Sequence, residues 1–116
     1  MSTDFQKQPL EKRKNDYEKL SQKFPDKIPI IVSKHKKSKL DNLPKDKFLV
    51  PDDITVIQFL SILRTKLKME PSDSLWLFVN GNMIPKPDSL ITFVHQSHRA
   101  EDGFLYVKYA EETFQG

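Results

Sequence analysis

The sequence predicts one α+β domain built on a four-stranded mixed sheet, and three observations lead to this expectation. The chain has 116 residues, the usual size of a single domain and too short for large scaffolds such as the eight-stranded parallel barrel. Hydrophobic residues make up 37% of it and include eight phenylalanines, so the apolar surface suffices for a core. Its apolar segments follow helix and strand spacings in the order helix, strand, strand, helix, strand, short helix, strand.

Two helical segments are expected before the first strand. Residues 10–24 carry apolar side chains at spacings of seven, three and four, which places them on one helical stripe. The stripe consists of Leu10, Tyr17, Leu20 and Phe24, and Pro25 should end the helix. A shorter segment is expected around Phe5, separated from the first by Pro9.

A hairpin with a long connection should follow. Ile28, Ile30 and Val32 alternate with other residues as in a strand whose core face they form. Pro29 has no amide hydrogen, which favours an edge or an outward-facing position for it. The second strand is expected at residues 48–51, after the polar run 34–47.

Thr55 and Gln58 match a capping box, so a helix should begin there. Its periodicity predicts one stripe facing the core and a second stripe about 90° away that does not join it. The core stripe is Val56, Leu60, Leu63 and Leu67; the second is Phe59, Ile62 and Lys66.

The remaining elements are a buried strand, a short helix, a last strand and a tail. The strand at 75–79 should end at the turn Asn80-Gly81-Asn82, and the last strand is expected at 104–109. Asp88 is predicted to cap a helix that carries Leu90, Phe93 and Val94. Residues 110–116 have little to pack and are expected to form a flexible tail.

Composition excludes several kinds of site. The absence of cysteine rules out disulfides, thiolate zinc sites, iron–sulfur clusters and a catalytic thiol on this chain. His95 and His98 lack an evident third ligand, so we expect no metal site, no cofactor and no enzyme activity. No apolar run approaches the roughly 20 residues of a membrane span.

Charge is uneven along the chain. Residues 1–50 hold 13 Lys and Arg against 7 Asp and Glu, whereas residues 51–116 hold 6 against 9. Such a basic half attracts nucleic acid, anionic lipid or acidic partners alike, or is simply solvated surface. Because no groove-reading helix or aromatic platform accompanies it, no specific nucleic-acid site is expected.

The order of the elements resembles the ubiquitin-like β-grasp fold, and several short sequence motifs point to a more specific resemblance. They are Pro9-Leu10-Glu11-Lys12-Arg13, residues 24–32 (FPDKIPIIV), residues 47–51 (KFLVP), residues 54–59 (ITVIQF) and residues 102–107 (DGFLYV). In this order and spacing they resemble the autophagy ubiquitin-like modifiers, the family of microtubule-associated protein light-chain-three and GABA-receptor-associated proteins. The resemblance implies a single domain at 1–116, with a helical extension at 1–24, a β-grasp core at 25–109 and a tail at 110–116.

The resemblance further implies a modifier that is conjugated through its terminal glycine, Gly116. Activating and transfer enzymes would carry it as an adenylate and as thioesters to the amine of phosphatidylethanolamine, and a cysteine protease would process or delipidate it. The protein would then be cytoplasmic, and on the autophagosome membrane when lipidated. The alternative is a β-grasp adaptor that binds partners without using its tail.

A second implied function is the capture of cargo receptors that carry a short aromatic-x-x-aliphatic motif. The first pocket would be lined by Asp16, Leu20, Pro29, Ile31, Lys47, Leu49 and Phe104. The second would be lined by Phe48, Val50, Pro51, Ile54, Phe59 and Ile62. Lys27, Lys45 and Lys66, together with Lys47, would attract acidic residues that flank the motif.

The chain departs from the family pattern at a few positions. Lys27 and Lys66 stand where the family often has arginine, which changes the geometry available to a carboxylate. Leu10 replaces a usual aromatic and Asp16 a usual glutamate. The aromatic that commonly precedes the terminal glycine is displaced by one position, because Phe114 is followed by Gln115.

Overall fold

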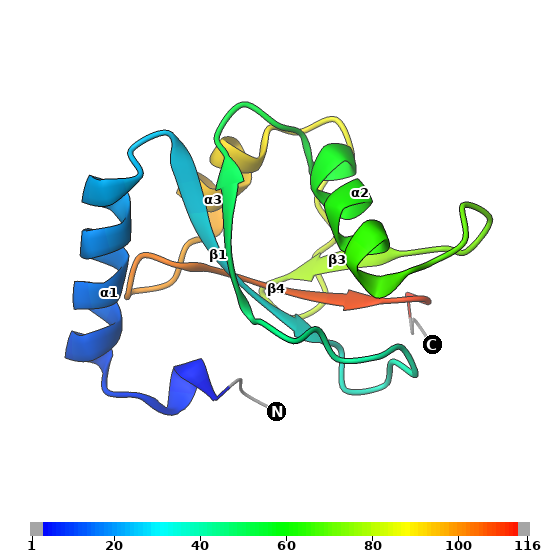
Figure 1. Ribbon diagram of the computed structural model, residues 1–116, viewed down its shortest axis with the longest axis horizontal. Coiled ribbons are helices and arrows are strands. Elements are labelled where there is room, and N and C mark those ends of the chain that lie inside the picture. Colours follow the sequence, from blue (N-terminus) through cyan, green and yellow to red (C-terminus); the bar gives the residue numbers. More distant parts are fainter. Residues whose placement is uncertain (1–3, 114–116) are drawn as a thin grey trace.

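The computed structural model describes residues 4–113 of the chain. Four strands form one mixed sheet: β1 (Lys27–Lys34), β2 (Lys47–Pro51), β3 (Trp76–Val79) and β4 (Leu105–Ala110). Their order across the sheet is β2-β1-β4-β3. β1 pairs antiparallel with β2 and parallel with β4, and β3 pairs antiparallel with β4. The predicted α+β grasp architecture is confirmed (Figure 1).

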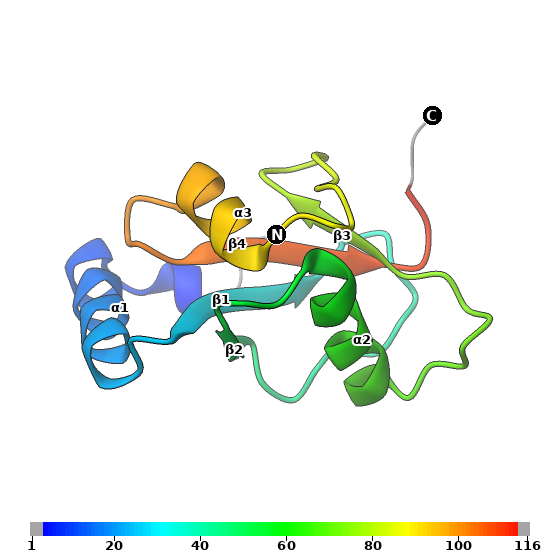
Figure 2. The ribbon, with the colours of Figure 1, turned by 90° about the horizontal axis from the view of Figure 1, so that it is seen from above.

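Two helical segments precede the sheet, as expected: the 3₁₀ helix η1 (Phe5–Lys7) and α1 (Leu10–Lys23). The last turn of α1 closes with the Phe24 amide donating to the Leu20 carbonyl, immediately before Pro25. α1 stands at one end of the sheet, while α2 lies toward the other end (Figure 1). The view from above shows the same separation (Figure 2).

Helices α2 (Val56–Leu67) and α3 (Ile91–His98) cover the core face of the sheet. The capping box of α2 is confirmed, because the Thr55 hydroxyl accepts the Gln58 amide and the Gln58 side chain accepts the Thr55 amide. Ile28, Ile30 and Val32 contribute to the main core from β1, as their alternation predicts.

The expected core face of α2 was wrong in one respect. Phe59 was placed on a second stripe outside the core, yet its side chain is 0% exposed and packs edge-on against Phe48, with ring centroids 6.3 Å apart. Leu60 and Leu67 are only partly buried. The buried face therefore centres on Val56, Phe59 and Leu63, because Phe59 packs against Phe48 of strand β2.

Of the two positions considered for Pro29, the edge strand is wrong and the position off the core face is confirmed. β1 is an inner strand, and Pro29 is buried on the face opposite the main core. Its register partner is Leu49 of β2, whereas the register with β4 begins only at Ile30. Proline is thus confined to the start of the strand, before β1 is paired on both sides.

Asp88 does not cap α3. The N-cap residue is Leu90, with no side-chain cap, and Leu90 forms a β-bridge with Thr55 that fixes the start of the helix. Phe93 lies in the helix, as predicted, and is 62% exposed. The turn after β3 is as predicted, with Asn80 and Gly81 at positive φ angles of 50° and 88°.

The expected start of the free tail at residue 110 is wrong as well. Ala110 is the last residue of β4, pairs with Trp76 and is fully buried. Glu111 makes two hydrogen bonds to the segment after β1.

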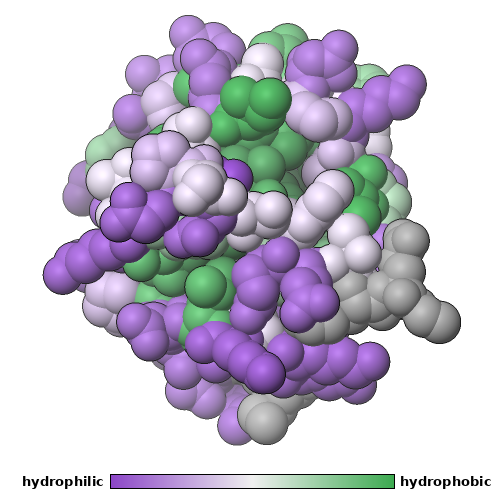
Figure 3. All heavy atoms as spheres, turned by 90° about the vertical axis from the view of Figure 1, so that its right-hand side faces the viewer, coloured by the Kyte–Doolittle hydropathy of each residue, from purple (hydrophilic) through white to green (hydrophobic). Residues whose placement is uncertain are grey.

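Among residues 4–113, no helix is long and apolar enough to cross a bilayer. The end of the molecule farthest from α1 shows apolar groups in patches between hydrophilic side chains (Figure 3).

Candidate functional site

The free edge of β2 is the centre of the candidate site. β2 pairs with β1 on one side, and within the described part of the chain no strand pairs with its other side. Alternation along β2 sends Lys47 and Leu49 to one face of the sheet and Phe48 and Val50 to the other. Lys47 is exposed and Leu49 is half-buried, whereas Phe48 and Val50 are buried.

On the first face lies a small apolar cluster, separate from the main core. It consists of the buried Phe5, Ile31 and Phe104, with Tyr17, Leu20 and Tyr106 packed around them. Ile31 and Phe104, two residues predicted to line the first pocket, have no exposed surface. Phe5 from η1 packs edge-on against Phe104, with ring centroids 5.0 Å apart. The sequence did not single out Phe5 for this site.

Lys47 completes this cluster from the edge strand. Its Nζ lies 4.7 Å from the ring centroid of Phe5 and 5.9 Å from that of Phe104. A cation over aromatic faces is attracted by the ring quadrupoles. The predicted lining residues Leu20, Pro29 and Leu49 lie on the same face, so six of the seven residues predicted for this pocket gather on one face of the sheet.

On the other face, the residues predicted for the second pocket belong to the main core or to its rim. Phe48, Val50 and Phe59 are buried within the core, and Ile54 and Ile62 are partly buried against it. Pro51 is half-buried at the end of β2. Lys66 of α2 places its Nζ 6.0 Å from the centroid of the Phe48 ring, so a cation borders this face too.

A hollow of about 380 Å³ runs along the edge of β2 between these two groups. Its lining joins residues predicted for three different roles, namely Lys47 and Leu49 of the first pocket, Phe48 of the second, and the basic Lys45 and Lys66. Leu43 and Pro44, which were not predicted for any role, complete the lining. Lys27 is not among them, because its register partner is Pro51, at the opposite end of β2 from Lys47. The structure thus brings Lys45, Lys47 and Lys66 together and leaves Lys27 apart.

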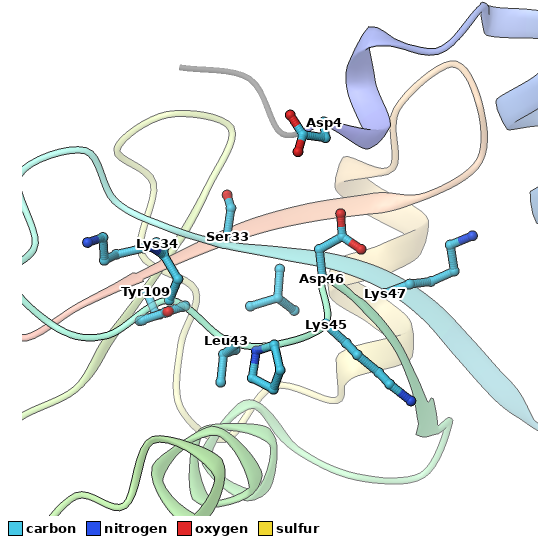
Figure 4. A pocket seen from close by; sticks show the side chains of 11 residues that line it. Asp4, Ser33, Lys34, Leu43, Lys45, Asp46, Lys47 and Tyr109 are labelled. Carbon is cyan, nitrogen blue, oxygen red and sulfur yellow. The ribbon is translucent and has the colours of Figure 1, made fainter.

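A larger and more polar hollow of about 680 Å³ adjoins it, beneath the segment that connects β1 to β2 (Figure 4). Lys34, Lys45 and Lys47 point away from one another around it, and Asp4 and Asp46 supply carboxylates (Figure 4). The charges of this hollow are therefore mixed, and its cations do not converge on one point.

A polar network fastens α1 beside the first face. Arg13 Nη1 donates to the carboxylate of Asp102 at 2.8 Å, and its Nε donates to the Gln8 carbonyl. Tyr106 donates its hydroxyl to the same carboxylate, and the Phe104 amide donates to the other oxygen. Burial, followed by this hydrogen bond, raises the pKa of Tyr106 well above its ordinary value, so the hydroxyl remains a donor.

A second contact joins α1 to α3. His95 Nε2 lies 2.8 Å from the Gly103 carbonyl oxygen and 3.3 Å from the Tyr17 hydroxyl. Burial lowers the pKa of His95, which keeps the ring neutral near pH 7. His98 Nδ1 pairs instead with Asn80 Nδ2. Among residues 4–113, no three His, Asp or Glu side chains gather where a metal ion would sit.

The comparisons with known proteins agree with one another. Residues 12–116 match the family described as "Autophagy protein Atg8 ubiquitin like". The chain belongs to the Atg8 family. It is 40% identical, over 109 residues, to "Autophagy-related protein 8" of Colletotrichum lindemuthianum and equally to that of Glomerella lagenarium, covering 93% of this chain and 89% of each relative. The crystal structure of Trypanosoma brucei ATG8 superposes with a TM-score of 0.89 at 32% identity, over 95% of both chains.

The resemblance found in the sequence is thereby confirmed, and this Atg8-family chain is a ubiquitin-like autophagy protein. Two residues near its candidate sites escaped the sequence analysis: Phe5 and Glu111. The isolated phenylalanine between polar residues was the available signal for Phe5. Nothing local distinguishes Glu111 from Glu112, since only the fold brings one of them to the segment after β1. Phe114, Gln115 and Gly116 lie outside the described residues.

Proposed function

We propose that this protein is conjugated through Gly116 to phosphatidylethanolamine and that it recruits partners by adding their aromatic-x-x-aliphatic segments to the edge of β2. The observation that carries the proposal is the free edge of β2, which lies between two apolar groups on opposite faces of the sheet. An extended segment gains backbone hydrogen bonds from such an edge and specificity from the groups that flank it.

The spacing of the motif fits this geometry. Side chains three positions apart in an extended segment point to opposite faces. An aromatic at the first position would approach the cluster of Phe5, Ile31 and Phe104, while the aliphatic at the fourth would approach Phe48 and Phe59. A motif with one or three positions between its anchors would point both anchors to the same face of the sheet.

Basic residues along this edge favour acidic segments. Lys45, Lys47 and Lys66 line the hollow beside β2, and both Lys45 and Lys66 are solvent-exposed. Exposed charges of this kind contribute more to the rate of encounter than to the final affinity.

Lipid attachment is supported by the family and by the chemistry of the last residue. An acyl carbon without a side chain offers little steric resistance to a nucleophile, which suits a glycine that passes between thioesters and an amine. The two acyl chains of the lipid would then hold the protein on a bilayer, where a single chain gives only marginal binding.

A titration with matched peptides tests the capture of partners. A peptide with an aromatic-x-x-leucine core and acidic flanks should bind, and the same peptide with its aromatic replaced by alanine should bind at least tenfold more weakly. A third peptide, methylated on backbone amides between the two anchors, keeps both side chains but loses donors to the edge. If the methylated peptide binds as well as the parent, strand addition to β2 is wrong.

The alternative function is an adaptor that binds peptides and is never lipidated. A lipidated modifier and an adaptor would both bind the peptide in this titration, so attachment of lipid to Gly116 is the observation that separates the two functions. Autophagosome localisation and interaction with cargo receptors belong to this proposal and depend on its outcome.

A further inference from the structure

The root of the C-terminal tail is held by a specific side-chain contact. We propose that Glu111 is a positioning residue for conjugation: it clamps the end of β4 to Ser38 and Lys39, so that the enzymes of the pathway need to order only the residues after it. This inference rests on the proposed conjugation through Gly116.

The topology brings the two partners of this clamp together. β1 and β4 are parallel neighbours, and Lys34 at the end of β1 is in register with Tyr109. The C-terminal ends of the two strands therefore lie side by side at the same end of the sheet. The His35 amide donates to the Tyr109 carbonyl at 2.9 Å, and the Tyr109 hydroxyl donates to the Asp41 carbonyl at 2.6 Å.

Glu111 uses both carboxylate oxygens. The Ser38 hydroxyl donates to Oε1 at 2.7 Å, and the Lys39 amide donates to Oε2 at 2.9 Å. Ser38 is only 7% exposed, and its hydroxyl oxygen also accepts the Leu40 amide at 3.1 Å. A single carboxylate thus bridges a side chain and a main-chain amide of a turn that is itself hydrogen-bonded.

The charge state of Glu111 suits this role. Partial burial acts to raise the pKa of Glu111. Hydrogen bonds from its own backbone, Ser38 and Lys39 act in the opposite direction and outweigh burial, so the pKa lies below its ordinary value. The carboxylate is therefore ionised near pH 7, and hydrogen bonds to an ionised acceptor are stronger than those between neutral groups.

The clamp defines how much chain is left to reach another protein. Gly116 lies five positions after Glu111, and covalent geometry limits the extended distance between them to about 18 Å. Each further residue that an enzyme has to fix adds an entropic cost. Releasing the clamp should therefore weaken productive binding of the tail, with little effect on the chemical step once the tail is bound.

Adjacent Glu112 provides a matched control. It carries the same side chain one position further on and is exposed, whereas Glu111 is half-buried against the turn. Substitution of either residue by glutamine removes one charge from the same stretch of chain, so a general effect of tail charge would appear in both variants.

The experiment measures formation of the thioester on the cognate activating enzyme as a function of the concentration of this protein. Glu111→Gln and Ser38→Ala should each raise the KM about three- to tenfold while kcat stays within twofold of wild type. The double variant should be no worse than the more affected single variant, because both changes break the same contact. Glu112→Gln should match wild type.

Thermal unfolding and hydrogen exchange accompany the kinetics. A lower protection of the Lys39 amide in Glu111→Gln, with global unfolding little changed, is expected. Equal KM values for Glu111→Gln and wild type, or equal losses in Glu111→Gln and Glu112→Gln, would overturn the clamp. If wild type itself is never charged, the proposed conjugation fails instead, and the two failures are thereby distinguished.

Discussion

The ring of Phe5 meets the ring of Phe104 edge-on, with the centroids 5.0 Å apart and the planes at 77°. Both side chains are nearly or wholly buried, and Lys47 lies over both rings. An aromatic side chain of a ligand can therefore contact Phe104 or Ile31 only after one of the side chains packed over them has moved. Phe5 is the member of the cluster that belongs to a short 3₁₀ helix near the chain terminus, so it is the one that moves most readily.

Replacing Phe5 by alanine should make peptide binding tighter. When the binding-competent state is only partly populated, the apparent Kd is raised by that fraction, and removal of the competing ring removes the penalty. We expect about a three- to tenfold lower Kd for an aromatic-x-x-leucine peptide, measured by titration calorimetry. Loss of the buried ring should cost about 3–5 kcal/mol of stability at most.

Phe93→Ala is the control for this prediction, since Phe93 is 62% exposed on α3 and away from β2. It should leave the Kd unchanged. Weaker peptide binding by Phe5→Ala, with the fold intact, would mean that Phe5 is part of the binding surface and does not compete with the ligand.

Leu49 is the apolar side chain that the edge strand presents on the first face. Leu49→Ala should weaken peptide binding by about 1–3 kcal/mol, as expected for an anchor contact, because the side chain is half-buried beside the hollow. Titration calorimetry measures the effect, and Ile57→Ala serves as control, because Ile57 is 55% exposed at the start of α2. An unchanged affinity for Leu49→Ala would remove this side chain from the site.

Local patterns predicted most of the fold. Alternation located β1 and its core face, the Thr55–Gln58 pair located the start of α2, and Pro25 marked the end of α1. Each of these signals acts within a few residues of the chain, where periodicity and capping decide the structure.

The errors have a common physical cause, which is contact between distant segments. Phe59 is buried because it meets Phe48 of β2, and the tail is held at Glu111 because β1 and β4 end side by side. Leu90 replaces Asp88 at the start of α3 because it bridges Thr55. For the same reason, the spacing of residues in the sequence did not reveal that Phe5 packs against Phe104.

Association with acidic peptides should depend on salt through Lys45 and Lys66. Both are exposed beside the hollow, so their charges are screened as the ionic strength rises. Between about 0.05 and 0.5 M salt, stopped-flow association should slow about three- to tenfold, whereas dissociation should change less than twofold.

The variant Lys45→Ala/Lys66→Ala should lose most of this salt dependence. Lys86→Ala is the control, because Lys86 is an exposed lysine in the segment between β3 and α3. Association rates that ignore salt in the wild type would assign Lys45 and Lys66 to ordinary solvated surface.

Stability should fall when the pH is lowered from 7 to 5.5. Burial lowers the pKa of both His95 and His35, so the unfolded chain takes up protons before the folded protein does. A group with a lowered pKa in the folded state stabilises the protein above its unfolded pKa, and this contribution is lost as the pH falls below that value. Both histidines contribute to this loss in the same direction.

Denaturant unfolding at several pH values tests this expectation. His95→Gln should be less stable than wild type at pH 7 but should lose less stability on acidification. His98→Gln controls for removal of a histidine from the same helix. A pH dependence identical in His95→Gln and wild type would contradict the assignment.

The displaced aromatic of the tail gives a further expectation that comes from the sequence, since residues 114–116 lie outside the described structure. Phe114→Ala should slow conjugation, and Gln115→Phe should leave it unchanged or improve it. If only Gln115→Phe is charged as a thioester, the tail has diverged and the adaptor function is the better account.

Conjugation itself tests the central claim most directly. The measurement is the fraction of protein attached to phosphatidylethanolamine over time, with the cognate activating and transfer enzymes and vesicles that contain this lipid. Wild type should become attached, while the variant lacking Gly116 should remain unmodified and bind the aromatic-x-x-leucine peptide with unchanged affinity. Failure of wild type to form the lipid adduct, or equal attachment of the variant without Gly116, would contradict a modifier that acts through its terminal glycine.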